Sequence, residues 1–301
     1  MKNMNKYENC LLCPRKCGIN RSTGQTGICG VSSEIKVARA ALHYWEEPCI
    51  SGKRGSGAVF FSGCSLHCVF CQNREISDGK EGKVISKERL SDIFMELADK
   101  GANNINLVTP GQYIPDIVWV VNDAKSRGMK LPIIYNTSGY ENVTELKLLE
   151  GIVDVYLPDF KYMDSTLSAM YSRAKDYPSV AKQAISEMVR QQPGVVIDDA
   201  TGLIQKGVIV RQLLLPGHVN DAKAILKYLH DTYQDSIYIS MMSQFTPIAL
   251  KDYPEINRTV TRREYERLID YAIKIGITNA FIQEGNVAKD SFIPAFDCEG
   301  V

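Results

Sequence analysis

The sequence lacks both a long apolar run and an excess of charge of either sign. No stretch of about 18 apolar residues occurs, which argues against a membrane-spanning helix. The 35 Lys and Arg residues equal the 35 Asp and Glu residues, so the chain has no basic excess for nucleic acid. The first residues, MKNMNKYENC, contain no apolar segment typical of a signal peptide. We therefore expect a cytoplasmic protein that binds neither membranes nor nucleic acids.

Internal repeats and low-complexity linkers are also absent, but cysteine is abundant, with nine residues. Eight of these cysteines lie between Cys10 and Cys71, and the ninth, Cys298, lies close to the end. Thiols stay reduced in the cytoplasm, and disulfides would be spread more evenly along a secreted chain. The clustering therefore indicates metal ligands.

Short apolar runs alternate with segments of helical periodicity from residue 58 onward. The predicted strands are 58–61 (AVFF), 105–108 (INLV), 132–135 (PIIY), 153–157 (VDVYL), 208–215 (VIVRQLLL), 236–241 (SIYISM) and 280–283 (AFIQ). The predicted helices are 87–100, 114–127, 220–230 and 262–275. This alternation predicts an α/β fold with a parallel sheet covered by helices.

Polar side chains follow nearly every predicted strand at its carboxyl end. An open parallel sheet would collect such residues at one switch point, whereas a barrel collects them from many strands at one face. The spread along this chain favours a complete or partial (β/α) barrel. The residues concerned are Ser62-Gly63-Cys64, Thr109-Pro110, Asn136-Thr137-Ser138, Asp159, Lys161, Pro216-Gly217-His218 and Ser243-Gln244.

Residues 1–57 differ from the rest of the chain, because they are rich in cysteine and glycine and show little periodicity. We interpret them as a small metal-binding lobe. The predicted division is a cysteine-rich lobe at 1–57, a barrel at 58–285 and a C-terminal tail at 286–301 that packs on the barrel.

Three cysteines, Cys64, Cys68 and Cys71, follow the first of these predicted strands within the stretch FSGCSLHCVFCQNREIS. A structural zinc site usually has four ligands in paired elements. Three thiolates on a four-iron cluster leave one iron open to a further ligand, which is where chemistry takes place.

The stretch CSLHCVFC resembles the CxxxCxxC signature of radical S-adenosylmethionine enzymes, in which an aromatic residue, here Phe70, typically precedes the last cysteine. Longer pieces resemble the homologues of the pyruvate formate-lyase activating enzyme. They are CLLCPRKCGINRSTGQTGICG, HYWEEPCISG, GSGAVFFSGC, FCQNREIS, NLVTP, LPDFKY, LLLPGH and YPEINR.

This resemblance implies a partial (β/α)6 barrel with a catalytic 4Fe-4S cluster on Cys64, Cys68 and Cys71. S-adenosylmethionine would then bind the open iron, and its reductive cleavage would give a 5′-deoxyadenosyl radical that abstracts hydrogen. An external one-electron donor of the flavodoxin or ferredoxin type is implied as a partner. The activating enzymes proper usually lack the cysteine-rich lobe, so the activase function is the name of this branch and is not established by the residues.

The resemblance also suggests which residues contact S-adenosylmethionine. Thr109 stands where the superfamily commonly has a Gly-Gly-Glu motif, so backbone carbonyls or its hydroxyl would replace the acidic residue. Arginine suits a carboxylate through its planar fork. The candidate contact residues are Phe70, Thr109, Asn136, Ser138, Asp159, Lys161, Arg211, His218 and Gln244.

A second set of cysteines, Cys10, Cys13, Cys17 and Cys29, offers four thiolates in 20 residues. Four ligands are typical of a saturated site. The spacing fits either zinc, as a staple for the lobe, or an auxiliary iron–sulfur cluster. Cys49 is interpreted as a partly buried free thiol and Cys298 as incidental.

Three functions are compatible with these residues. The first is an activase that forms a glycyl radical in a protein partner. The second is radical modification of a small molecule or a peptide. The third is a non-catalytic iron–sulfur scaffold, which the absent acidic motif favours.

Overall fold

The computed structural model describes residues 5–248, 250–283 and 294–301. Its centre is a ten-stranded sheet with the order β10-β9-β8-β6-β5-β4-β2-β1-β3, and β7 pairs with β8 beside this path. The strands are β1 (Ile35–His43), β2 (Ser56–Phe61), β3 (Lys83–Ile85), β4 (Ile105–Val108), β5 (Ile133–Thr137), β6 (Val155–Pro158), β7 (Val196–Ile197), β8 (Ile204–Leu213), β9 (Tyr238–Met242) and β10 (Ala280–Ile282).

Seven of these strands, from β2 to β10 along the path, pair in parallel. The described path does not close, because β10 and β3 lie at its two ends. The prediction of a partial parallel barrel is thereby confirmed. All seven predicted strands are present, with ends displaced by a few residues.

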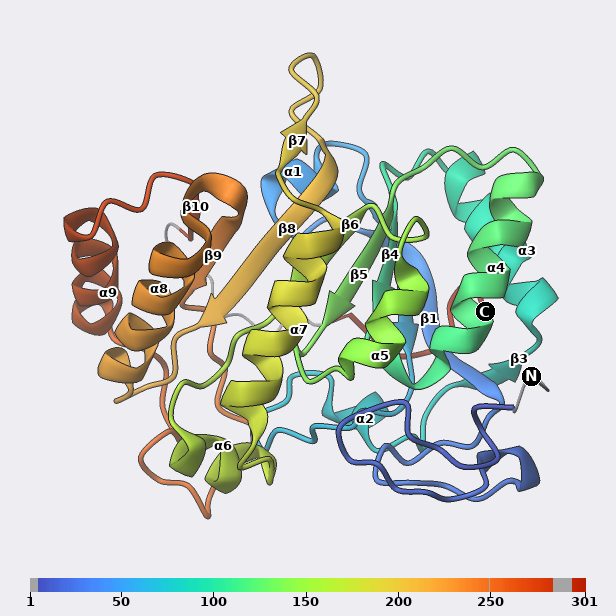
Figure 1. Cartoon of the computed structure of the whole chain (residues 1–301), viewed down its shortest axis with the longest axis horizontal. Helices are drawn as coiled ribbons and strands as arrows, with labels where there is room; N and C mark the ends of the chain where they lie inside the picture. Colours follow the sequence, from blue (N-terminus) through green and yellow to red (C-terminus); the bar gives the residue numbers. More distant parts are fainter. Residues whose placement is uncertain (1–4, 249, 284–293) are drawn as a thin grey trace.

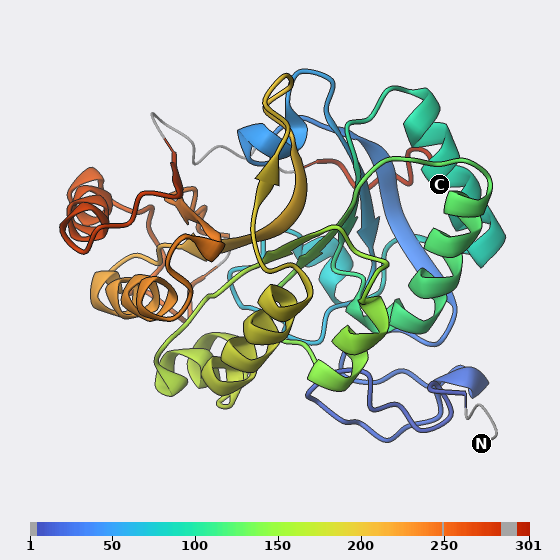
Figure 2. The same cartoon turned by 45° about the horizontal axis from the view of Figure 1, so that its top comes forward.

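Seven of the described helices follow one another along the outer side of the curved sheet (Figures 1 and 2). They are α3 (Lys87–Asp99), α4 (Ile114–Ser126), α5 (Val143–Leu146), α6 (Ser165–Ser172), α7 (Tyr177–Gln191), α8 (Val219–Tyr233) and α9 (Arg262–Lys274). Two short helices, α1 (Pro48–Ser51) and α2 (Arg74–Ser77), lie between strands or in loops. Every residue of β2, β4, β5 and β6 is buried, as expected for strands covered on both faces.

The antiparallel edge of the sheet was not predicted. Strand β1 pairs antiparallel with both β2 and β3, and its sequence IKVARAALH follows directly on the cysteine-rich segment. The sheet therefore begins before residue 57, and the cysteine-rich segment that precedes it is residues 5–34. The boundary at residue 57 stays a prediction, as does the C-terminal tail, of which residues 294–301 lie within the described part.

Described residues of this tail bond to β1. The Ala40 amide donates to the Glu299 carbonyl at 2.8 Å, and the Cys298 amide donates to the Ala38 carbonyl at 3.0 Å. The backbone of Cys298 thus bonds to β1, and its thiol has no part in either set of cysteines.

The cysteine-rich lobe lies at the carboxyl end of the sheet, and α1 lies at the opposite end (Figure 1). Its own apolar core is small and consists of Tyr7, Cys10 and Leu12. Hydrogen bonds of the buried Arg21 side chain add to this small core, because Arg21 donates to the carbonyls of Val31 and Gln112 at 3.2 and 2.8 Å. The lobe is therefore held by hydrogen bonds and by the barrel more than by its own core.

Within the described ranges, no helix combines the length and the apolar character that crossing a bilayer would require.

Gly139 offers a test of the packing between the loops after β5 and β6. Its φ is +75°, and an added Cβ would lie 2.3 Å from the Asp159 carbonyl oxygen. We expect Gly139→Ala to lower the free energy of unfolding by about 1–2 kcal/mol through the left-handed backbone. A further cost of about 1–3 kcal/mol arises from the overpacking.

Gly276→Ala is the matched control, because Gly276 has a φ of +86° and its Cβ would meet no described heavy atom within 4 Å. The measurement is the urea unfolding midpoint of both variants. Equal destabilisation of the two would contradict the packing argument.

Candidate active site

A cavity with many polar lining residues lies at the carboxyl ends of the parallel strands. It encloses about 1220 Å³ of empty volume, including its open mouth. The three cysteines of the CxxxCxxC stretch line it together with polar residues that follow four different strands. Among its lining residues are Glu46, Cys64, Cys68, Phe70, Cys71, Thr109, Asn136, Ser138, Asp159, Lys161, Arg211 and Gln244.

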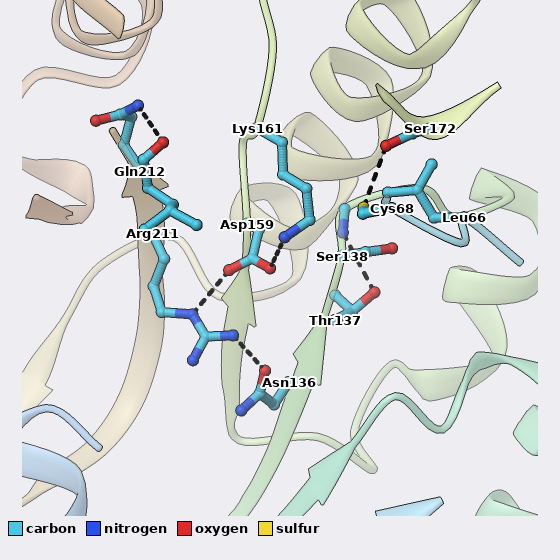
Figure 3. Close-up of polar contacts among 12 residues, drawn as sticks. Leu66, Cys68, Asn136, Thr137, Ser138, Asp159, Lys161, Ser172, Arg211 and Gln212 are labelled. Atoms are coloured by element: carbon cyan, nitrogen blue, oxygen red, sulfur yellow. Dashed lines mark hydrogen bonds and ion pairs between the residues drawn. The ribbon is translucent and has the colours of Figure 1, made fainter. Parts of the chain in front are cut away.

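The cysteine loop follows β2 directly and is shaped by local hydrogen bonds. The Leu66 amide donates to Cys64 Sγ at 3.4 Å, and the Ser172 hydroxyl donates to Cys68 Sγ at 3.1 Å (Figure 3). The Cys71 amide closes the loop by donating to the Cys68 carbonyl at 3.1 Å. The three thiols therefore line one cavity from a loop whose shape is supported by these hydrogen bonds.

Burial raises the pKa of the Cys71 thiol to about 12, and the neighbouring Cys68 and Cys64 add to this effect. Burial likewise raises the pKa of Cys64. Thiols of this kind stay protonated near neutral pH unless a metal binds them as thiolates. Donors to sulfur are also the contacts that tune an iron–sulfur cluster, so the donor set fits one.

A network of partly buried charges forms the other side of the cavity (Figure 3). Asp159 bonds to Lys161 at 2.6 Å and to Arg211 at 2.9 Å. Arg211 also donates to the Asn136 amide oxygen at 2.6 Å and to Glu46 at 3.2 Å. Burial opposes the ionisation of Asp159, but the charges of Arg211 and Lys161 outweigh it and hold the pKa of Asp159 below its usual range.

Eight of the nine residues predicted to contact S-adenosylmethionine line this cavity. His218 does not line it. Its Nε2 lies 3.1 Å from the Tyr171 hydroxyl, directly before α8. Thr109 has a φ of +58°, a strained value for a β-branched residue and one that accompanies a sharp turn out of β4.

Three residues of the site were not predicted from the sequence. Glu46 enters the barrel from the segment before α1 and bonds to Asn106 at 3.0 Å as well as to Arg211. Ser172 comes from α6, and Arg15 of the lobe donates to the Ser65 carbonyl of the cysteine loop at 2.9 Å. Glu46 and Glu47 are adjacent acidic residues in the piece HYWEEPC, which is a signal that the sequence offers. Nothing in the sequence indicates that Glu46 lies inside the barrel.

The N-terminal cysteines Cys10, Cys13, Cys17 and Cys29 line a second cavity. Cys49 lies in α1 and is buried among Ile50, Ile134 and Val155, away from both sets of cysteines. Among the described residues, no group of three or more His, Cys, Asp or Glu side chains converges as a ready-made metal-ion site. The ligand roles of both cysteine sets therefore stay proposals.

Comparisons with known proteins agree with this geometry. Residues 51–177 match the model of the 4Fe-4S single cluster domain. The chain is also 28% identical over 281 residues to an uncharacterized protein of Methanocaldococcus jannaschii, covering 91% of this chain and 77% of that protein.

Two crystal structures share the fold. Streptococcus suis SuiB bound to S-adenosylmethionine has 14% identity and a TM-score of 0.50, over 74% of this chain and 48% of that one. A radical SAM methyltransferase from Sphaerobacter thermophilus has 16% identity and a TM-score of 0.51, over 76% of this chain and 66% of that one. The chain thus spans about half and about two thirds of these two proteins.

The chain thus contains a segment similar to a 4Fe-4S cluster domain, and its fold is similar to the folds of these two structures. Its similarity to the branch of the pyruvate formate-lyase activating enzymes rests on the sequence pieces alone.

Glu141, which lines the second cavity, gives the stability of the fold a pH dependence that can be measured. Burial raises the pKa of this carboxyl from 4.5 to about 7, against the opposing hydrogen bond from Thr137. Between these two pH values the folded state binds more protons than the unfolded state, so stability falls as the pH rises. The total loss is about 3 kcal/mol.

We expect Glu141→Gln to remove this part of the pH dependence, so that its free energy of unfolding changes less between pH 4.5 and 8 than that of the wild type. Urea unfolding at a series of pH values measures the difference. Parallel curves for the two proteins would contradict the raised pKa.

Proposed function

We propose that this protein is a radical S-adenosylmethionine enzyme whose active site is the cavity lined by Cys64, Cys68 and Cys71. The observation that carries the proposal is their position: three partly buried thiols share one cavity with polar side chains from the ends of the parallel strands. Cys64, Cys68 and Cys71 would hold a 4Fe-4S cluster, which when bound would supply the electron for reductive cleavage of S-adenosylmethionine to methionine and a 5′-deoxyadenosyl radical.

The residues of the chain hold and orient the ligand. Arg211 already uses three N–H groups for Asp159, Glu46 and Asn136, so a ligand carboxylate shares it with these partners. Because the charges of Asp159, Lys161 and Arg211 are fixed by pairing before the ligand arrives, little reorganisation is needed when it binds. The hydroxyl and backbone of Thr109 serve the ligand amino group in place of the absent acidic motif.

Phe70 and its neighbours exclude water from the reacting centre. The Phe70 ring packs on Phe245 with centroids 5.6 Å apart and on Tyr162 with centroids 6.3 Å apart. An apolar surface that excludes water beside the cysteine loop protects a carbon radical from side reactions.

The reaction proposed is hydrogen abstraction, with a protein or peptide as the substrate in the manner of a glycyl-radical activase. This finer assignment rests on the sequence resemblance alone. An external one-electron donor of the flavodoxin or ferredoxin type supplies the electron.

Anaerobically reconstituted protein with reductant should convert S-adenosylmethionine to 5′-deoxyadenosine and methionine in equal amounts. Cys68→Ser should form none above the background of free reductant, because one cluster ligand is lost, whereas Cys298→Ser should retain the wild-type rate. Chromatographic quantification measures both products.

The scaffold alternative makes the opposite prediction. If the wild type carries a full cluster, forms no 5′-deoxyadenosine and shows an unchanged electron paramagnetic resonance signal on addition of S-adenosylmethionine, the enzyme proposal is wrong.

Ser172→Ala tests the donor to Cys68. Loss of this hydrogen bond should lower cluster retention or 5′-deoxyadenosine formation about tenfold, the lower end of the range for residues that support a metal ligand. Ser179→Ala is the control, because the Ser179 hydroxyl donates only to the Asp176 backbone on an exposed turn. Equal iron content and activity in both variants would contradict a supporting role for Ser172.

A further inference from the structure

The four N-terminal cysteines surround a cavity between the lobe and the barrel. This cavity encloses about 550 Å³ of empty volume, and its lining includes Cys10, Cys13, Cys17 and Cys29 together with Cys64 of the active-site loop. Cysteines that are separated by up to 19 positions in the sequence are thus brought to one place. Thr109, Thr137 and Ser138 line both this cavity and the active-site cavity, so the two share a wall.

The loop that contains Cys29 is bonded directly to the loop that contains the active-site cysteines. The Cys64 amide donates to the Cys29 carbonyl at 3.2 Å. Three residues along, the His67 ring nitrogen lies 2.6 Å from the Ile28 carbonyl. One hydrogen bond therefore separates a cysteine of one set from a cysteine of the other.

A buried cation lies beside the N-terminal thiols. The Arg21 guanidinium is 1% exposed and donates to Cys10 Sγ at 3.8 Å. Four thiolates in a buried cavity repel one another, and a fixed positive charge offsets part of this repulsion. Donors to sulfur are also what sets the reduction potential of an iron–sulfur cluster.

The spacing fits both zinc and an iron–sulfur cluster, and the position favours the cluster. Three close cysteines and one remote cysteine also occur in ferredoxin cluster sites. In addition, a redox-inert zinc ion would make no use of the direct bond to the active-site loop.

We propose that Cys10, Cys13, Cys17 and Cys29 bind a second iron–sulfur cluster, which passes one electron to the cluster of the active site. The proposal rests on the function proposed for Cys64, Cys68 and Cys71. The external donor loses one electron, the second cluster gains it and then returns to its oxidised state as the active-site cluster is reduced. No bond forms or breaks in this transfer.

Iron, sulfide and zinc counts test the site itself. The wild type should contain about eight irons, and the triple variant Cys64→Ser/Cys68→Ser/Cys71→Ser should retain about four, with less than one zinc. The triple variant keeps all four N-terminal cysteines, so the test needs no variant of the N-terminal cysteines that fails to fold. Cys49→Ser is the matched control and should retain all eight.

A folded triple variant that holds no iron, or that holds one zinc in its place, would overturn the proposal. This outcome is distinct from failure of the proposed function, which is absence of 5′-deoxyadenosine from protein with an occupied active-site cluster.

Electron paramagnetic resonance tests the proximity and the transfer. In fully reduced wild type, the signals of the two clusters should be broadened or split by their interaction. A spectrum equal to that of two isolated clusters would overturn the assignment of adjacent sites. After rapid mixing with reduced flavodoxin and freezing, the N-terminal signal should appear before the active-site signal, and the reverse order would overturn the transfer.

Discussion

The barrel interior depends on the pairing of Arg211 with two carboxylates from different parts of the chain. Asp159 follows β6, Glu46 precedes α1, and both bond to Arg211 on β8. A buried charge that loses its partner costs several kcal/mol, so these pairs fix the three segments relative to one another. Because Glu46 reaches in from the end opposite the cysteine loop, the same arginine also holds the segment that closes the barrel at that end.

The paired charges explain why the cavity is ready for a charged ligand. Lys161 and Arg211 are cationic. Burial lowers the pKa of Lys161, but the charge of Asp159 outweighs this effect and raises the pKa above its usual range. Burial raises the pKa of Glu46, and Arg211 and Asn106 counteract this effect. These pairs therefore hold the side chains in position. A ligand that bound here would replace some of their polar partners and would not need to order the side chains.

The parallel strands and most of the site could be predicted from the sequence, because apolar runs and polar strand ends are local patterns. Eight of nine predicted contact residues line the cavity. His218 does not line the cavity, since a position after a strand does not fix where a loop turns. Glu46, Ser172 and Arg15 were missed because their roles depend on contacts across more than 40 positions. Strand β1 was missed because it pairs antiparallel at an edge.

The lobe and the barrel form one folding unit at the cysteine loops. A Cβ on Gly30 would lie 2.2 Å from the Asp78 carbonyl oxygen, and one on Gly79 would lie 2.4 Å from the Gly30 carbonyl oxygen. Backbones this close require glycine on both sides. Since Gly30 follows Cys29 and Gly79 lies beyond Cys71, the loops of both cysteine sets order together. A ligand bound at one set would therefore stabilise the other set, even where the two share no ligand.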